Sequence, residues 1–348
     1  MTDTALWPDV LGRLLRREEL PPDCVERALE TILEGEATDA QIAGFAVALR
    51  AKGETTGELA TLVRTMLRFA ERVDVADVDG LIDTCGTGGD RAGTVNVSTM
   101  AALIAVGAGA RVAKHGNRAA SSQCGSADVL EALGVVIELG PDGVARCIRE
   151  AGIGFCFAPR FHPALRFAGP PRRELGVPTT FNFLGPLANP AGVKRQAVGV
   201  SDPSMAERVI GALAELGAEH ALVFYGDDGL DELTTTTTST ILELRSGMVA
   251  SRSLDPTSLG LATADRSALA GGDAAGNAEA VHRVLAGHAG PVRDIAALNA
   301  AAALVVAGIA DDLGDGLEHA FASIDEGRAA AALEALVRTS VAARDEGA

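Results

Sequence analysis

From residue 81 onward, short apolar segments alternate with longer amphipathic ones, and this alternation constrains the fold more than any other feature of the chain. The plausible strands are Leu81–Thr84, Arg111–Ala113, Ile153–Ala158, His220–Tyr225 and Thr240–Leu244. The plausible helices between them are Met100–Gly109, Ser126–Leu133, Asp142–Ala151 and Ser204–Leu216. Such alternation favours a mostly parallel central sheet with helices on both faces. We therefore predict an α/β fold, with Ala- and Leu-rich helices beyond residue 270 as further cover for the sheet.

The segment before this region is predicted to be helical throughout. Apolar residues recur at helical spacing between residues 8 and 72, which indicates four short helices. The fourth helix begins at a capping box, Thr55-x-x-Glu58. The apolar face of the first helix is expected to comprise Val10, Leu11, Leu14 and Leu15. We predict a helical domain over residues 1–75 and an α/β domain over residues 76–348, with a segment near 165–190 that crosses back onto the helical domain.

One stretch, from Asp83 to Gly134, carries most of the candidate chemistry. Its glycines follow a predicted strand, and glycine lets a backbone approach a phosphate closely, with several N–H groups aligned toward one anion. The residues Asn96–Thr99 lead into a helix, and the start of a helix offers free N–H donors and positive potential. Lys114 and Arg118 add positive charge. Together these features indicate a substrate with several phosphates.

Taken singly, each of these pieces has a simpler interpretation. A glycine-rich turn after a strand is usually only a turn, and serine or threonine before a helix is usually a cap. The acidic run Gly226–Glu232 is by itself most often solvated charge, and we expect Asp227 and Asp228 to be solvated. The threonine run Thr234–Thr238 is expected to be an edge or a loop, not a site. The spacing fits neither the dinucleotide-binding fingerprint nor the P-loop.

Composition limits the partners and the compartment. The net charge of −17 argues against duplex DNA or an anionic membrane as a partner, since both require basic surfaces. The five cysteines are scattered and lack the paired spacing of a zinc site, so we expect reduced thiols in a cytoplasmic protein. We expect no signal peptide, because no basic region precedes an apolar core at the N-terminus, and no membrane-spanning run.

The order of the motifs resembles one family closely. Gly-Thr-Gly-Gly-Asp, Asn-Val-Ser-Thr, Lys-His-Gly-Asn-Arg and Gly-Ser-Ala-Asp-Val-Leu-Glu-Ala-Leu-Gly look like the signature blocks of the anthranilate phosphoribosyltransferases, and the likeness covers nearly the whole chain. The resemblance implies a fold of the nucleoside phosphorylase/phosphoribosyltransferase type. It also implies transfer of the phosphoribosyl group of 5-phosphoribosyl 1-pyrophosphate (PRPP) to the amine of anthranilate, on the route to tryptophan. Mg²⁺ is the implied cofactor, and a homodimer formed through the helical domain is the implied assembly.

The resemblance also assigns residues. The implied metal ligands are Ser98, Asp231 and Glu232. The implied PRPP-binding residues are Gly86, Gly89, Asp90, Thr94, Asn96, Val97, Ser98, Thr99, Lys114, His115, Gly116, Asn117, Arg118, Ala119, Ala120, Ser121, Ser122 and Ser126. The implied anthranilate-binding residues are Gly86, Asn117, His162 and Arg172. Arg172 suits a carboxylate because its planar guanidinium can donate two parallel hydrogen bonds. Pro178 departs from the family pattern, which often has Arg there.

Two other functions are compatible with the same architecture. A pyrimidine-nucleoside phosphorylase would bind free phosphate and a nucleoside, and would not need the Asp231–Glu232 pair. A non-catalytic relative that binds nucleic acid would need a basic groove. No strong general base is expected, since an aromatic amine is already nucleophilic and the chain shows no catalytic dyad.

Overall fold

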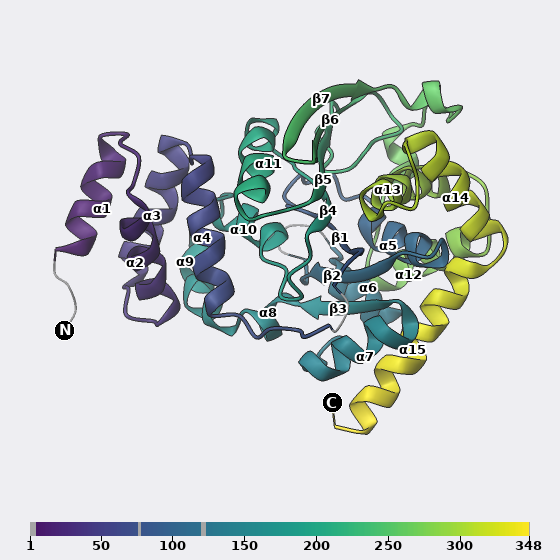
Figure 1. Ribbon diagram of the computed structural model, residues 1–348, viewed down its shortest axis with the longest axis horizontal. Helices are drawn as coiled ribbons and strands as arrows, with labels where there is room; N and C mark the ends of the chain where they lie inside the picture. Colours follow the sequence, from purple (N-terminus) through teal and green to yellow (C-terminus); the bar gives the residue numbers. More distant parts are fainter. Residues whose placement is uncertain (1–4, 76–77, 120–122, 348) are drawn as a thin grey trace.

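The computed structural model describes residues 5–75, 78–119 and 123–347. It begins with a bundle of four helices (Figure 1). These helices are α1 (Leu6–Leu15), α2 (Pro22–Leu33), α3 (Asp39–Lys52) and α4 (Thr56–Arg68). The predicted capping box is confirmed, because the Glu58 N–H donates to the Thr55 hydroxyl and the Thr55 N–H donates to the Glu58 carboxylate.

The predicted apolar face of α1 is wrong at one position. Leu6, Trp7, Val10 and Leu14 are buried, whereas Leu15 is 79% exposed. The buried residues follow three- and four-residue spacing, and Leu15 stands about 100° further round the helix than Leu14. Leu15 therefore faces away from the bundle.

Seven strands form one sheet in the order β3-β2-β1-β4-β5-β6-β7. They are β1 (Leu81–Gly86), β2 (Arg111–Gly116), β3 (Ile153–Phe157), β4 (Arg195–Gly199), β5 (His220–Gly226), β6 (Ser239–Arg245) and β7 (Met248–Leu254). The first five strands in chain order run parallel, and β6 and β7 are antiparallel to their neighbours. The predicted mostly parallel sheet is confirmed, although β4 and β7 were not expected.

Two hydrophobic cores cover the two faces of the sheet. One core is formed with the sheet by α5, α6, α7 and α12 to α15 (Figure 1). Their bounds are α5 (Val97–Gly107), α6 (Ser126–Ala132), α7 (Pro141–Ala151), α12 (Ala274–Leu285), α13 (Pro291–Ala307), α14 (Leu313–Asp325) and α15 (Arg328–Asp345). The other core joins the four-helix bundle to α10 (Phe181–Leu187), α11 (Ala206–Glu215) and strands β4 and β5. The bundle and the sheet therefore share a continuous apolar core.

A segment after β3 runs along the bundle. It comprises α8 (Ala158–Phe161), η1 (Pro163–Ala168), α9 (Gly169–Leu175) and α10. The η1 turn packs on α2, α9 packs on α3, and α10 packs on α4. The Thr180 hydroxyl donates to buried Glu54 at 2.5 Å, which ties the α3–α4 turn to the start of α10.

The direction in which successive strands are added to the sheet reverses between β1 and β4, and we call this place the switch point of the sheet. From β1 the chain continues outward through β2 and β3, and from β4 it continues in the opposite direction through β5. In open α/β sheets, ligands bind beyond the carboxyl ends of the strands at such a point.

In the described parts of the chain, no helix combines the length and the apolar character needed to cross a bilayer.

Candidate active site

Loops from three strands meet at the switch point. The Gly88 N–H, after β1, donates to Asp231 Oδ2, after β5, at 2.7 Å. The Thr87 N–H donates to the Gly199 carbonyl at the end of β4 at 2.9 Å, and the Ser201 hydroxyl donates to the Gly88 carbonyl at 2.7 Å. Gly88 and Gly89 have φ values of 64° and 87°, which side-chain-bearing residues rarely adopt. These hydrogen bonds fix the glycine loop, residues 86–90, in a turn that packs against the loops after β4 and β5.

The loop that carries Asp231 crosses directly over the ends of β1 and β4. A Cβ atom on Gly199 would lie 1.6 Å from the Asp231 carbonyl oxygen, and one on Gly86 would lie 2.4 Å from Asp231 Oδ2. Neither strand end can therefore carry a side chain at these positions. The approach at Gly86 agrees with its place in the glycine block, whereas Gly199 was not identified from the sequence.

The carboxylates of this loop are destabilised as anions. Burial and the negative charge of Asp90 raise the pKa of Asp231 to about 7, against the opposing hydrogen bond from the Gly88 N–H. Burial and the charge of Asp231 raise the pKa of Glu232 well above its usual range, although Lys114 and the Ser98 N–H oppose the shift. Neighbouring desolvated carboxylates are stabilised by a bound proton or a cation.

Lys114 lies inside the protein and is 1% exposed. Its ammonium group donates to the Thr84 carbonyl at 2.6 Å and to the Ser98 hydroxyl at 3.2 Å. Burial lowers the pKa of Lys114, and the negative charge of Asp83 opposes that shift. β2 extends to Gly116, so Lys114 and His115 lie on the strand and not in the loop predicted to follow it.

A magnesium ion fits this set of oxygens. Within the described ranges, no group of three or more His, Cys, Asp or Glu side chains is arranged to hold a metal by itself. Mg²⁺ commonly uses one or two carboxylates together with substrate phosphate oxygens. Asp231 and Glu232 are hard oxygen ligands held in a desolvated position, and the Ser98 hydroxyl lies on the Lys114 side of the same site.

The start of α5 is anchored by residues distant in sequence. The Asn96 side chain donates to the Cys124 carbonyl at 3.2 Å and accepts from the Asn277 amide at 2.8 Å, so it does not cap the helix. Thr94 forms an isolated bridge with Ala270. The buried Thr99 hydroxyl has no hydrogen-bond partner among the described residues. Asn277 was not singled out in the sequence, because nothing local distinguishes it.

Asp128 organises the loop after β2. One of its carboxylate oxygens accepts from the Ala119 N–H at 3.0 Å and from the Gly125 N–H at 2.8 Å. Arg118 is paired with Asp128 and with Glu131, at 2.9 and 2.8 Å, so it is not a free cation here. The predicted residues Ala120, Ser121 and Ser122 lie outside the described residues.

Glycines and small hydroxyls bring the other predicted members of this loop together. A Cβ on Gly116 would lie 2.3 Å from the Ser126 hydroxyl oxygen, and Ser126 donates to the Asn117 carbonyl at 3.3 Å. The Asn117 side-chain oxygen accepts from the next backbone N–H at 2.7 Å. Val97, the first residue of α5, is buried, and its N–H donates to the Val95 carbonyl at 2.8 Å.

Two neutral histidines stand side by side next to α10. His115 Nδ1 lies 2.9 Å from the Gly185 carbonyl and His162 Nε2 lies 2.9 Å from the Ala188 carbonyl, with 5.1 Å between the ring centroids. Burial lowers the pKa of His115 to about 3 and that of His162 to about 4. Because each ring must donate to its carbonyl, the other nitrogen is an acceptor, and in both rings it is buried without a partner in the described structure.

Arg172, on α9, is a partly buried cation. Its guanidinium carbon lies 5.5 Å from the centroid of the Phe181 ring, and burial lowers its pKa. The guanidinium forms no ion pair and no hydrogen bond with any described residue. Arg173 next to it is exposed. Of the two arginines, only Arg172 is oriented by an aromatic ring and left open to an anion.

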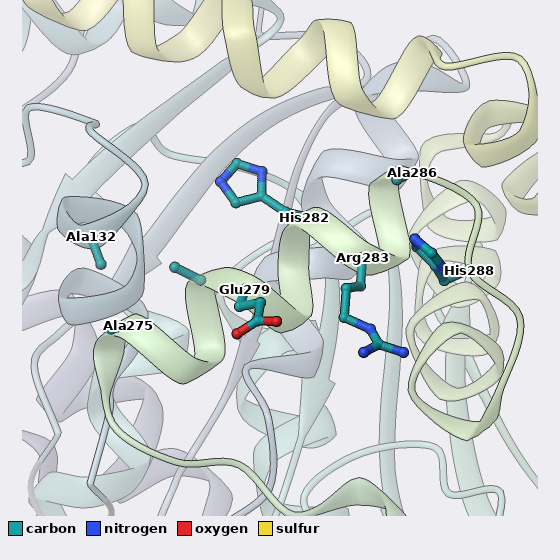
Figure 2. A pocket seen from close by; sticks show the side chains of 8 residues that line it. Ala132, Ala275, Glu279, His282, Arg283, Ala286 and His288 are labelled. Carbon is teal, nitrogen blue, oxygen red and sulfur yellow. The ribbon is translucent and has the colours of Figure 1, made fainter.

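Two surface hollows lie away from the switch point. One, of about 530 Å³, is lined by Ala132 and by residues in and just after α12, and there His282 and Arg283 point in different directions (Figure 2). The other, of about 580 Å³, is lined by Leu81 and Arg195, at the opposite ends of β1 and β4 from the loops described above. Neither hollow is lined by the candidate PRPP-, anthranilate- or metal-binding residues.

The chain matches known proteins over nearly its full length. Residues 8–70 match the helical bundle domain of a glycosyl transferase family, and residues 78–330 match the a/b domain of that family. An anthranilate phosphoribosyltransferase of Rhodococcus jostii is 54% identical over 333 residues, which cover 94% of this chain and 91% of the relative. The chain belongs to the anthranilate phosphoribosyltransferase family. The predicted family, fold class and glycosyl-transferring activity are confirmed.

Solved structures of anthranilate phosphoribosyltransferases agree with this membership. The enzyme from Thermus thermophilus is 40% identical, with a TM-score of 0.90 over 96% of this chain and 99% of its own. The enzyme from Saccharomyces cerevisiae, in complex with PRPP and Mg, is 26% identical, with a TM-score of 0.89 over 98% of this chain and 99% of its own. These matches do not favour the phosphorylase or the nucleic-acid-binding alternative.

Proposed function

We propose that the switch-point site of this chain transfers the phosphoribosyl group of PRPP to the amine of anthranilate. The products are N-(5-phosphoribosyl)anthranilate and pyrophosphate, and the step belongs to tryptophan biosynthesis. Two sets of contacts carry the proposal. The glycine loop contacts Asp231, and Ser98 contacts both Lys114 and Glu232. Family membership and a yeast relative solved with PRPP and Mg support it.

PRPP is assigned to the loops after β1 and β2 and to the start of α5. The loop of residues 86–90 and the start of α5 at residues 96–99, together with Lys114, would hold the diphosphate. The N–H groups available for this exclude those of Thr87, Gly88, Val97 and Thr99, which already donate within the protein. The loop from Gly116 to Ser126 would hold the remainder. Mg²⁺, held by Ser98, Asp231 and Glu232, would neutralise the negative charge that develops on pyrophosphate as it leaves.

Anthranilate is assigned to the space between the sheet and α10. Arg172 would bind its carboxylate, and Gly86, Asn117 and His162 would orient its ring and amine toward C1 of the ribose. The transition state at C1 has oxocarbenium character, so the protein contributes mainly position and charge. The two histidines are neutral acceptors, and no strong general base is required.

We also propose three properties of the whole molecule. Exposed Leu15 and Val47, on the mutually packed helices α1 and α3, support a homodimer formed through the bundle. Five cysteines in the thiol form, four of them buried, support the cytoplasm as the compartment. The division between the domains is placed between residues 75 and 76.

The reaction is tested by the loss of anthranilate fluorescence on mixing with PRPP. We expect the signal to fall with Mg²⁺ present and to persist after chelation. Phosphorolysis of thymidine or uridine without metal dependence, and no consumption of anthranilate, would instead identify a nucleoside phosphorylase.

A further inference from the structure

We propose that Asn299, in the middle of α13, is a positioning residue for the Asp231–Glu232 pair. Its side chain is 3% exposed and contacts the backbone of Leu233, the residue directly after the pair. Asn299 Oδ1 accepts from the Leu233 N–H at 3.0 Å, and Nδ2 donates to the Leu233 carbonyl at 2.9 Å. One amide thus fixes both backbone polar groups of the residue that follows the proposed magnesium ligands.

The other side of the same loop is fixed by Asp228, which was expected to be solvated. That expectation is wrong, because Asp228 Oδ2 accepts hydrogen bonds from the Thr234 and Thr236 hydroxyls, at 2.9 and 2.5 Å. Its Oδ1 accepts from the Leu230 N–H at 3.2 Å. The threonine run therefore supplies hydroxyl donors that close the loop. Asp231 and Glu232 lie between two anchored residues, Leu230 and Leu233, whose side chains are both fully buried.

α13 connects this loop to the other half of the proposed metal site. It packs along α5, and Ser98 is the second residue of α5. Asn299 also donates to the Ile295 carbonyl within α13 at 2.9 Å, so its amide is fixed by its own helix. Mg²⁺ requires near-ideal geometry at short oxygen distances. Two adjacent carboxylates repel each other, so without a clamp the loop would not keep Asp231 against Gly88 and Glu232 against Ser98.

The inference rests on the proposed role of Asp231 and Glu232 as metal ligands, and binding of Mn²⁺ to the full-length protein with pyrophosphate tests it. Free Mn²⁺ is measured by electron paramagnetic resonance. We expect Asn299→Ala to weaken Mn²⁺ binding by roughly 10- to 100-fold, as for other groups that orient metal ligands. The matched control is Ser323→Ala, which removes a buried hydrogen bond to the Ile104 carbonyl of α5 away from the loop. It should keep the wild-type affinity.

Four outcomes separate the possibilities. If folded Asn299→Ala binds Mn²⁺ as tightly as Ser323→Ala, the positioning role is overturned. If Asn299→Ala does not fold, as judged by circular dichroism, it is replaced by Asn299→Leu, which fills the space but lacks both hydrogen bonds to Leu233. Unchanged Mn²⁺ affinity in that variant overturns the role. If Asp231→Ala/Glu232→Ala keeps wild-type Mn²⁺ binding, the proposed metal role itself fails. If the double variant loses Mn²⁺ binding while Asn299→Ala binds Mn²⁺ as tightly as the wild type, the positioning role of Asn299 fails and the metal role of the pair stands.

Discussion

Gly88 and Asp231 lie 143 positions apart in sequence and are joined by a 2.7 Å hydrogen bond from backbone N–H to carboxylate. The first belongs to the loop proposed to hold the diphosphate, and the second to the loop proposed to hold the metal. Because Gly86 and Gly199 leave no room for a side chain beneath Asp231, the two loops form one unit.

Replacing Asp231 and Glu232 together by Ala should lower kcat by two or more orders of magnitude, because charge stabilisation of the leaving group is lost. The melting temperature should not fall, since both carboxylates are destabilised as anions in the fold. Steady-state rates and thermal unfolding measure the two effects. Near-normal turnover would refute the metal role.

Arg172→Ala should raise KM for anthranilate by roughly 10- to 100-fold, because a charged hydrogen bond contributes about 1.5–3 kcal/mol. KM for PRPP should change little. Arg173→Ala is the matched control, since Arg173 is exposed beside it. Equal increases in the two constants for Arg172→Ala would show that this arginine does not bind the acceptor carboxylate.

Gly199→Ala should disturb the Asp231 loop, because the new Cβ would lie 1.6 Å from the Asp231 carbonyl oxygen. We expect a stability cost of about 1–3 kcal/mol, as in overpacked cores, and a higher Mg²⁺ requirement. Gly272→Ala is the control, since a Cβ there meets nothing within 4 Å. Denaturant unfolding and magnesium titration of the rate measure both effects. Identical behaviour of the two variants would contradict the close approach.

The stability of the metal-free protein should depend on pH through Asp231. Its folded pKa of about 7 lies above the ordinary 3.8, so its protonated form is favoured by folding. This contribution is complete below about pH 4 and is lost as the pH rises through 7. Burial raises the pKa of Asp83 to about 6, and this changes the stability in the same direction. The contribution of Asp231 is therefore isolated by comparing the wild type with Asp231→Asn.

Thermal unfolding from pH 4 to 8 without metal measures this effect. We expect the melting temperature of the wild type to fall relative to that of Asp231→Asn as the pH rises. A constant difference between the two proteins would show that the carboxylate is not desolvated.

Leu15→Glu should dissociate the proposed homodimer, because a charge placed in an apolar interface must be desolvated. Met248→Glu, at a position 73% exposed on edge strand β7, is the control and should leave the assembly unchanged. Light scattering after size exclusion gives the molar mass. A wild-type protein that is already monomeric would contradict the proposal.

Much of the fold is predictable because its signals are local. The capping box at Thr55 and the helices beyond residue 270 follow from spacing and caps within one segment. β4 is only five residues long and begins with Arg195 and Gln196, so no apolar run marks it. β7 is exposed along nearly its whole length and shows no alternation.

The site is predictable only in part, for a physical reason. The glycine block and the Asp231–Glu232 pair are contiguous in sequence, so they could be identified as blocks. Gly199, Asn277 and Asn299 act through contacts with residues far along the chain, and no local pattern distinguishes them. The pairing of Arg118 with Asp128 and Glu131 also depends on how the loop folds onto α6.

The segment that holds His115 and His162 through the carbonyls of Gly185 and Ala188 also packs on the four-helix bundle. The wall proposed to face the aromatic acid therefore belongs mechanically to both domains, whereas the loops proposed to hold PRPP are anchored by residues of the α/β domain. A small rotation of the bundle would change the width available to the aromatic ring and leave the phosphate loops in place. Selectivity for substituted rings should accordingly respond to changes at the α3–α4 turn, far from any atom that reacts.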